Sequence, residues 1–382
     1  MTKTEKKQEY DLWWALESQA AGLRTMQIVK SAGGSGSLFE MEKEELLALK
    51  GIGERAADRI IYRRNCWNYE KALQSLQETG IRFVSVYDPD YPKRLHHTPN
   101  PPFALFVKGS LPEDHKPAVA IVGARECSEY GRYCASYFAR GLTMSGVNVL
   151  SGMAIGIDGI AQQAALNAGG RSFAVLGNGP DICYPPANRK LYDRLVRSGG
   201  LISEYGPHVS AVAWHFPARN RILAGLCDIV LVVEAREKSG TLITADMALD
   251  AGRDVMIVPG RITDPLSVGC IGLWENGACP ACNVSDVLEV LSGKGFSVSN
   301  EGEMLPAASD DEIKLPLESM EKLVYSGFDF YARSAEEVME NTKLPYQDFL
   351  QTLMKLEMKG LIKETGRGYY VRVLNTQEDE HG

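Results

Sequence analysis

The stretch WHFPARNRILAGLCDIVLVVEAREKSGTLITADMALDAGRDVMIVPG, residues 214–260, decides the fold. It contains two short apolar runs, DIVLVVE (228–234) and DVMIVP (254–259), which are rich in β-branched residues and bounded by turn signals. Such runs are typical of strands in a parallel sheet that is covered on both faces. The segment between them begins with Ser239 and Gly240 and continues with apolar residues at helical spacing. This order of strand, turn, helix and strand predicts a βαβ unit.

The loops of this unit carry the first candidate site. Ser239 and Gly240 are expected at the carboxyl edge of the sheet, where open α/β folds bind ligands. Upstream, Arg219, Asn220 and Arg221 are expected just before the helical stretch ILAGL, where forked guanidinium groups and free N–H groups at a helix start would suit phosphates. Each feature alone also fits a solvated or acid-paired arginine and an ordinary helix N-cap. Together, at one sheet edge, they favour a phosphate or nucleotide site.

Composition sets the bounds for function. The chain has 382 residues, of which 45% are hydrophobic and 24% charged, as in a globular protein of two or three domains. No apolar stretch is long enough to span a bilayer and the start does not resemble a signal peptide, so we expect a cytoplasmic protein without membrane contact. The net charge of −8 argues against a globally basic nucleic-acid binder. Any site for a polyanion must therefore depend on local clustering of cations.

The cysteine pattern does not predict a metal site. Eight cysteines are scattered along the chain, mostly inside apolar segments, which indicates reduced thiols. Cys279 and Cys282 form a single CxxC pair with no second pair and no histidine cluster after it. A structural zinc ion usually needs four ligands. We therefore expect no bound metal.

Residues 1–80 are predicted to form a small helical domain. Apolar residues recur at helical spacing in several short segments, and LKGIGERA places Gly51 and Gly53 on either side of Ile52. This is the pattern of a helix-hairpin-helix, whose glycines let backbone N–H groups approach a phosphate. It is equally a common way to turn a corner between two helices. The sequence leaves both interpretations open.

Residues 81–292 are predicted to form an extended Rossmann-type parallel sheet with helices on both faces. From residue 117 onward, apolar strands alternate with helical segments, and glycines such as Gly123 and Gly152 follow the strands. The loop SGMAIGID is rich in glycine but is not GxGxxG, and no Walker motif is present. We therefore expect a phosphate-bearing ligand and no nucleotide cofactor.

The C-terminal part follows a linker expected at residues 293–316. Residues 317–373 read as three amphipathic helices followed by a hairpin around Arg367, which is the pattern of a winged-helix domain. The third helix carries Lys355 and Lys359 but also acids, so it lacks a basic stripe. A protein-docking or structural role fits this domain at least as well as the reading of duplex DNA.

These motifs, in this order, resemble the DNA-processing protein A (DprA, or Smf) family. The resemblance covers nearly the whole chain and rests on LFVKG, VAIVGAR, SGMAIGID, VLGNGPDICYP, LISEYG, FPARNRILAGL, VVEAREKSGTLITADMAL and GRDVMIVPG. It implies a helical N-terminal domain, an extended Rossmann domain and often a winged helix. It further implies binding of single-stranded DNA, dimer formation and loading of a RecA-type recombinase onto incoming strands in natural transformation, without catalytic turnover. The chain departs from the family pattern at Gln162, where a histidine is common, and at Ile271, where an asparagine is common.

The first hypothesis is a single-stranded DNA-binding recombination mediator that protects incoming DNA. Arginine and lysine side chains would neutralise phosphates, and N–H groups of the glycine loops would hold them. Phe216 fits a core position better than base stacking, and Asp158 and Glu204 fit the orientation of arginines better than acid–base chemistry. The expected binding residues are Gly123, Arg125, Ser151, Gly152, Arg219, Asn220, Arg221, Lys238, Ser239, Gly240 and Thr241.

A second hypothesis is an enzyme, a nucleotide N-glycosidase related to lysine-decarboxylase-like proteins. Glu234 or Asp158 would then face a ribosyl carbon. The two arginines beside Asn220 and the winged-helix pattern suit a polymer better than a mononucleotide. A third and weaker hypothesis is a phosphate-sensing scaffold. Self-association through the Rossmann domain is also expected, motivated by the apolar helix face of VSDVLEVL (284–291).

Overall fold

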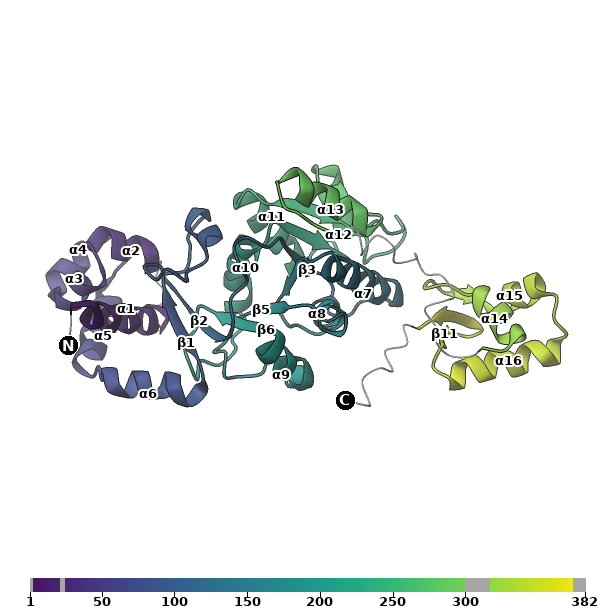
Figure 1. The fold of residues 1–382 in the computed structure, drawn as a ribbon, viewed down its shortest axis with the longest axis horizontal. Helices are drawn as coiled ribbons and strands as arrows, with labels where there is room; N and C mark the ends of the chain where they lie inside the picture. The colour runs from purple at the N-terminus through teal and green to yellow at the C-terminus, as the bar shows by residue number, and fades with distance from the viewer. Residues whose placement is uncertain (1–2, 21–24, 300–316, 374–382) are drawn as a thin grey trace.

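The computed structural model describes residues 3–20, 25–299 and 317–373. A helical N-terminal part, a central α/β part and a C-terminal part follow one another along the longest axis of the molecule (Figure 1). No helix among these described residues is both long and apolar enough to cross a bilayer. Within the predicted linker, residues 300–316 lie outside the described ranges.

The N-terminal part is built from six helices around two buried tryptophans, Trp13 and Trp14. The predicted glycine hairpin joins the fourth and fifth helices, and Gly51 adopts a left-handed φ of 100° there. Arg64 of the fifth helix donates to the carbonyls of Phe39 and Met41, each at 2.7 Å. This arginine therefore holds the helices together. The helices are α1 (Lys3–Ala20), α2 (Thr25–Ala32), α3 (Ser35–Glu40), α4 (Lys43–Ala48), α5 (Glu54–Asn65) and α6 (Tyr69–Thr79).

A nine-stranded sheet forms the centre of the molecule, in the order β1-β2-β6-β5-β4-β3-β7-β8-β9. The seven strands from β6 to β9 in this order are parallel, as predicted, whereas β1 and β2 extend the sheet with antiparallel pairing. The strands are β1 (Arg82–Ser85), β2 (Ala104–Gly109), β3 (Ala118–Val122), β4 (Asn148–Ser151), β5 (Ser172–Leu176), β6 (Gly199–Ser203), β7 (Ile229–Val232), β8 (Asp254–Ile257) and β9 (Cys279–Pro280).

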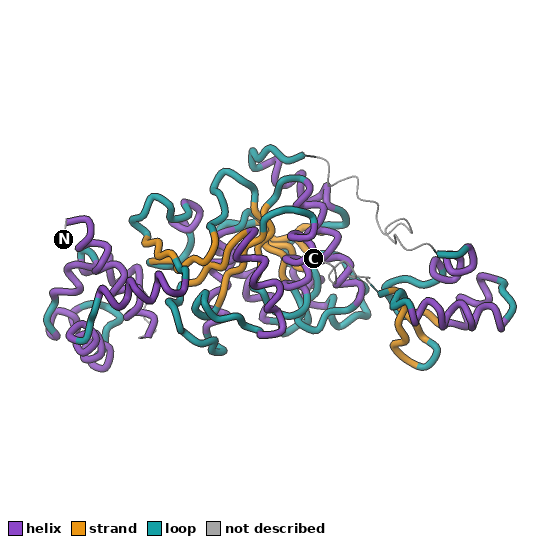
Figure 2. The backbone as a smooth tube through the Cα atoms, turned by 60° about the horizontal axis from the view of Figure 1, so that its bottom comes forward, coloured by secondary structure: helices purple, strands orange, loops and turns teal. Residues whose placement is uncertain are grey.

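Helices cover both faces of this sheet, which explains why its inner strands are apolar throughout (Figure 2). Val119 and Ile121 of β3 face a core shared with α7, α8 and α13, while Ala118 and Ala120 face a second core shared with α10 and α11. The helices of the central part are α7 (Glu129–Met144), α8 (Ile157–Asn167), α9 (Arg189–Ser198), α10 (His215–Leu226), α11 (Gly240–Asp250), α12 (Val268–Glu275) and α13 (Val284–Gly293), with short 3-10 turns η1 (Lys93–His97) and η2 (Pro186–Asn188).

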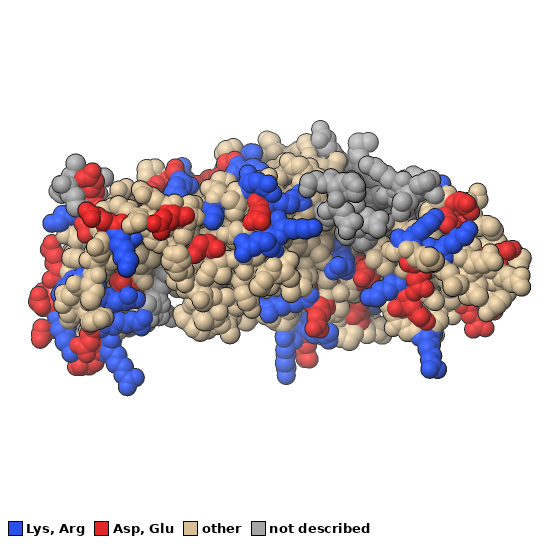
Figure 3. All heavy atoms as spheres, turned by 90° about the horizontal axis from the view of Figure 1, so that it is seen from below, with Lys and Arg blue, Asp and Glu red and all other residues tan. Residues whose placement is uncertain are grey.

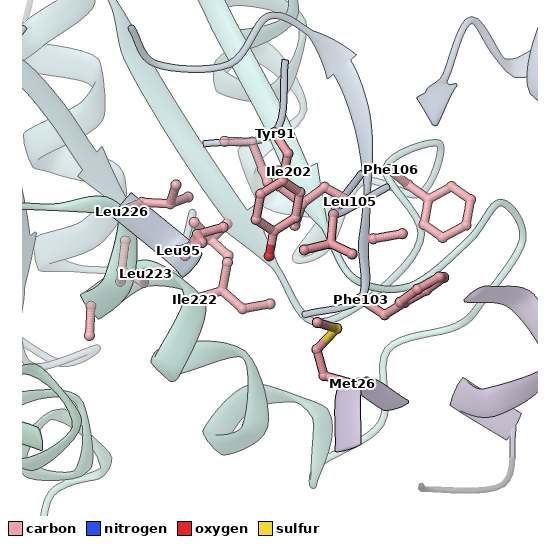
Figure 4. Packing of buried hydrophobic residues seen from close by; sticks show 14 of the residues in the cluster. Met26, Tyr91, Leu95, Phe103, Leu105, Phe106, Ile202, Ile222, Leu223 and Leu226 are labelled. Atoms are coloured by element: carbon pink, nitrogen blue, oxygen red, sulfur yellow. The ribbon is translucent and has the colours of Figure 1, made fainter. Parts of the chain in front are cut away.

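Helix α10 is fixed by its apolar side. Ile222 and Leu223 belong to the core cluster that also holds Leu95 of η1 and Ile202 of β6 (Figure 4). The helix begins at His215, so the expectation that Arg219 and Arg221 precede a helix is wrong. Pro217 lies in the first turn of α10. An N–H group at this position would have no intrahelical acceptor, so the proline is tolerated there. The helix can therefore begin upstream of the two arginines.

The reason given for self-association through residues 284–291 is also wrong. Val284, Val287 and Leu288 of α13 are buried in the core that α13 shares with α7. The apolar face of this helix is therefore used within the chain.

The C-terminal module, residues 317–373, has its own core around Phe328, Phe349 and Leu353. The three expected helices and the expected hairpin are present, and β10 adds a third strand in the order β10-β12-β11. The elements are α14 (Ser319–Ser326), β10 (Arg333–Ser334), α15 (Ala335–Thr342), α16 (Tyr346–Met358), β11 (Ile362–Gly366) and β12 (Tyr369–Arg372).

Candidate nucleic-acid interface

A cleft of about 650 Å³ opens at the carboxyl edge of the parallel strands. The loops that follow β3 and β7 form part of its wall, and the N-terminal half of α10 forms another part. This is the edge at which open α/β sheets bind ligands. The cleft brings together many of the predicted site residues, namely Gly123, Arg125, Arg219, Asn220, Lys238, Ser239, Gly240 and Thr241.

Three exposed cations line this cleft: Arg125 after β3, and Arg236 and Lys238 after β7. Within the ranges that the structure describes, none of them forms an ion pair with an acid. Sequence reasoning missed Arg236. Its signal was its place two residues before Lys238 in the same loop. These side chains are positioned to meet an anion in the cleft.

The start of α11 joins the two loops. Ser239 is the N-cap of α11, and its hydroxyl accepts the N–H of Thr241 at 3.2 Å. The Thr241 hydroxyl in turn donates to the carbonyl of Gly123 at 3.2 Å. The N-cap interpretation of Ser239 is therefore confirmed. The positive end of the α11 dipole therefore lies at the cleft, where it favours negative charge.

Arg219 is buried beneath the cleft, with only 6% of its surface exposed. Its guanidinium donates to the carbonyl of Val175 in β5 and to that of Gly152, just after β4, at 3.3 Å. Burial lowers the pKa of Arg219 to about 10, an effect that nearby Asp158 opposes. Burial also raises the pKa of Asp158, which accepts the N–H of Gly152 at 3.0 Å. Arg219 thus ties two strand ends together.

The remaining predicted residues do not line the cleft. The Nη2 group of Arg221 donates to both carboxylate oxygens of Glu204, each at 2.8 Å, so the expectation that Glu204 orients an arginine is confirmed. Ser151 is fully buried, and its hydroxyl donates to the carbonyl of Ile121 at 2.6 Å. Gly152 contacts Arg219 instead of the open cleft. The cleft is therefore supported, but not lined, by Arg221, Ser151 and Gly152.

Aromatic side chains form another wall of the cleft. Phe216 of α10 is half-buried and lines the cleft, so the expectation that it lies in the core is wrong. Its ring lies 5.5 Å from that of Tyr184, which is 45% exposed, and 6.0 Å from the Arg125 guanidinium. Tyr184 was missed, although it lies in the loop after β5 at the same sheet edge. A planar, apolar ligand group could stack against these two rings.

The buried acid at the end of β7 has a structural role. Glu234 is 1% exposed and does not line the cleft. Its carboxylate accepts the hydroxyl and the N–H of Ser128, the N-cap residue of α7. Burial raises the pKa of Glu234, and the Ser128 hydrogen bonds oppose that rise. Glu234 therefore anchors the start of α7. In the described part of the chain, no group of three or more His, Cys, Asp or Glu side chains could hold a metal ion.

The sequence of residues 82–292 matches the family model of DNA recombination-mediator protein A. The chain belongs to this family. The matched range contains every residue of the cleft. It also spans the nine-stranded sheet, so the fold that the resemblance implied for the central part is confirmed.

Curated relatives of the family extend the match. Protein Smf of Synechocystis is 32% identical over 393 residues, which cover 94% of this chain and 98% of that protein. DNA processing protein DprA of Streptococcus pneumoniae is 45% identical over 204 residues, or 53% of this chain and 72% of that protein.

Two solved structures of the family are similar to this one. The X-ray structure of DprA from Streptococcus pneumoniae has a TM-score of 0.65 and 33% identity, and covers 74% of this chain and 97% of that one. DNA processing protein A from Helicobacter pylori, solved to examine its single-stranded DNA binding mode, has a TM-score of 0.50 and 27% identity. It covers 56% of this chain and 98% of that one.

Proposed function

We propose that this protein binds single-stranded DNA in the cleft and acts as a recombination mediator. One observation carries the proposal: the exposed cations Arg125, Arg236 and Lys238 line the same cleft as the aromatic rings of Phe216 and Tyr184. Cations beside aromatic rings are the combination that single-strand binders use for phosphates and bases. Because the whole chain carries a net charge of −8, a site for a polyanion depends on such a local group of cations. On the face seen in Figure 3, basic and acidic side chains both occur along the length of the molecule.

The aromatic wall favours a single strand over a duplex. In a duplex, each base is already stacked between its neighbours, so stacking on a protein ring first requires that a base step be opened. In a single strand, successive bases can turn toward Phe216 and Tyr184 while the backbone follows the cations. The single-stranded DNA binding mode of the Helicobacter pylori relative supports this choice.

The partner of the bound strand would be a RecA-type recombinase in the cytoplasm. A mediator holds a strand, protects it and transfers it to the recombinase, which fits the family description of a recombination mediator. For incoming DNA in natural transformation, the cleft would be the holding site. Pull-down of a purified RecA-type recombinase by the DNA-bound protein tests this step.

We infer that the protein acts as a homodimer. Ile262 is 84% exposed, and Val268 and Trp274 of α12 are 40% and 54% exposed. These apolar side chains lie on and just before α12 and offer a surface that a second copy could bury. Light scattering at micromolar concentration should show a dimer, and Ile262→Asp with Trp274→Ala should give a monomer.

No catalytic turnover is part of the proposal. Glu234, one of two acids considered for a glycosidase, is engaged at the N-terminus of α7 and is absent from the cleft wall. Asp158 lines the cleft but accepts a backbone N–H and faces Arg219. Incubation with nucleoside monophosphates should release no free base on chromatography. Release of many equivalents of base per protein would show catalytic turnover and would contradict this part of the proposal.

The central test compares oligonucleotides by fluorescence anisotropy. A labelled single strand and its matching duplex are titrated with full-length protein at several salt concentrations. We expect tighter binding of the single strand, little dependence on its sequence and a steady loss of affinity with salt. Tighter binding of the duplex than of the single strand would contradict the proposal.

A further inference from the structure

A small aromatic contact joins the C-terminal module to α7. The Phe330 ring stacks on Tyr133 with 4.5 Å between ring centroids and 21° between planes. The next residue, Tyr331, stacks on Tyr130 at 5.0 Å and 28°. Two consecutive rings of the module therefore cover two tyrosines that lie one turn apart on α7.

The loop that carries these rings is held rigidly. Phe328 turns inward and is 1% exposed in the core of the module. Asp329 accepts the N–H of Tyr331 at 2.6 Å and the Nε–H of Arg333 at 3.0 Å, and its carbonyl accepts the N–H of Arg372 at 2.7 Å. These bonds present Phe330 and Tyr331 outward, away from the module's own core.

The face that receives them has the composition of a base-stacking platform. Tyr133 also stacks on Tyr137, at 5.9 Å and 17°, so three tyrosines form a row along α7. The Arg261 guanidinium lies 3.7 Å from the centroid of the Tyr331 ring. A row of rings with an arginine beside it is what single-strand binders present to successive bases.

This face of α7 lies next to the path that single-stranded DNA would follow as it leaves the cleft. Arg125 follows β3, Lys238 follows β7 and Arg261 follows β8, and these three strands are parallel neighbours. Their carboxyl ends lie side by side, roughly 4.8 Å apart from strand to strand. The cations that follow them therefore form a series along one edge, from the cleft toward the contact at Arg261. Helix α7 itself begins just beyond the loop of Arg125.

We propose that the tyrosine face of α7 is a second stacking site for single-stranded DNA, and that Phe330 and Tyr331 occupy it while no DNA is bound. The module then competes with the strand, and DNA displaces it. This inference rests on the proposed function of the cleft. When a segment blocks a site, the apparent affinity is the intrinsic affinity multiplied by the fraction of molecules in which the site is free. Release of the segment therefore raises the apparent affinity.

The test uses the full chain with Phe330→Ala and Tyr331→Ala. Both side chains lie outside the module's core, so circular dichroism should remain that of the wild type. We expect small-angle scattering to show a larger radius of gyration, as the module leaves α7. A long oligothymidylate that reaches beyond the cleft should bind roughly fivefold tighter or more, the gain of one stacked base. A short one that fills only the cleft should bind unchanged. The matched control, Tyr346→Ala with Met354→Ala, removes two exposed apolar side chains from the same module and should change neither quantity.

A triple variant that adds Tyr133→Ala identifies the site. It should release the module but lose the gain in affinity. If the gain persists without Tyr133, or if the released module brings no gain, the platform is not a DNA site and the inference fails. An unchanged radius of gyration in the double variant would equally overturn it. If the wild type binds neither oligonucleotide, the proposed function itself fails.

Discussion

The backbone of Gly152 lies directly against the guanidinium of Arg219, so closely that a β-carbon at residue 152 would overlap it. Both residues were expected to contact a phosphate. The missing side chain of Gly152 instead makes room for a side chain of the protein, which reaches the carbonyl groups at the ends of β4 and β5. In the proposed function, the phosphate contacts would therefore come from the exposed cations of the cleft, Arg125, Arg236 and Lys238.

Gly152→Ala should destabilise the protein by about 1–3 kcal/mol, because the new methyl group forces Arg219 away from its acceptors. Denaturant unfolding measures the loss. Gly293→Ala is the matched control, since residue 293 is the exposed last residue of helix α13 and has open space around it. It should be neutral or should stabilise the protein by about 0.5–1 kcal/mol. A similar loss in both variants would contradict the role of the Arg219 contact.

Arg221→Ala should lower the free energy of unfolding by about 2 kcal/mol, because it removes the charge that faces the half-buried carboxylate of Glu204. Arg221→Ala combined with Glu204→Gln should be less destabilised than the sum of the two single variants. Additive losses would show that the two groups do not stabilise each other. The binding of single strands by folded Arg221→Ala should keep its salt dependence, since Arg221 does not line the cleft.

The sequence predicted local features better than long-range pairing. The run at 228–234 and the turn at Ser239 are local signals, and both led to the correct strand, N-cap and sheet edge. The partners of Arg219 and Arg221 come from other strand ends, Val175 and Glu204, at sequence separations of 44 and 17 residues. No periodicity encodes such a pairing. An arginine that supports a site and one that faces the ligand therefore look alike in sequence.

Arg125→Ala with Lys238→Ala should reduce the salt dependence of single-strand binding. Each phosphate contact contributes about 0.7 to the slope of log K against log salt, so the slope should fall by about 1.4. The loss of affinity should be similar for different sequences, because phosphates carry no sequence information. Lys71→Ala with Arg197→Ala removes two exposed cations outside the cleft and should leave the slope unchanged. An unchanged slope in the cleft variant would exclude these two phosphate contacts.

Phe216→Ala should weaken single-strand binding by about 1–3 kcal/mol, the contribution of one base stacked on an aromatic ring. Phe216→Trp keeps an aromatic face and should retain most of the affinity, whereas Phe216→Leu keeps only apolar bulk and should not. Anisotropy at fixed salt separates the three variants. If leucine restores binding as well as tryptophan does, the side chain acts by packing against Tyr184 and not by stacking a base.

His215 should make the stability of the protein depend on pH. The imidazole is 5% exposed, lies 2.9 Å from the carbonyl of Gly177 and stacks on Tyr205. Burial lowers its pKa, so the folded state keeps this histidine neutral while the unfolded state binds a proton below about pH 6.5. Because the unfolded state then holds more protons, acidification favours unfolding. The contribution is full at neutral pH and is lost below about pH 6.5, by at most about 1.4 kcal/mol per pH unit.

The measurement compares the wild type with His215→Gln by denaturant unfolding between about pH 7.5 and about pH 5.5, the range in which a histidine titrates. The difference between the two proteins cancels the titration of carboxyl groups common to both, such as Asp158 and Glu234, whose raised pKa values act in the opposite direction. That difference should shrink as the pH falls. A difference at His215 that stayed constant over this range would show that the folded protein accepts the proton as readily as the unfolded chain. The start of α10 would then not hold the ring neutral.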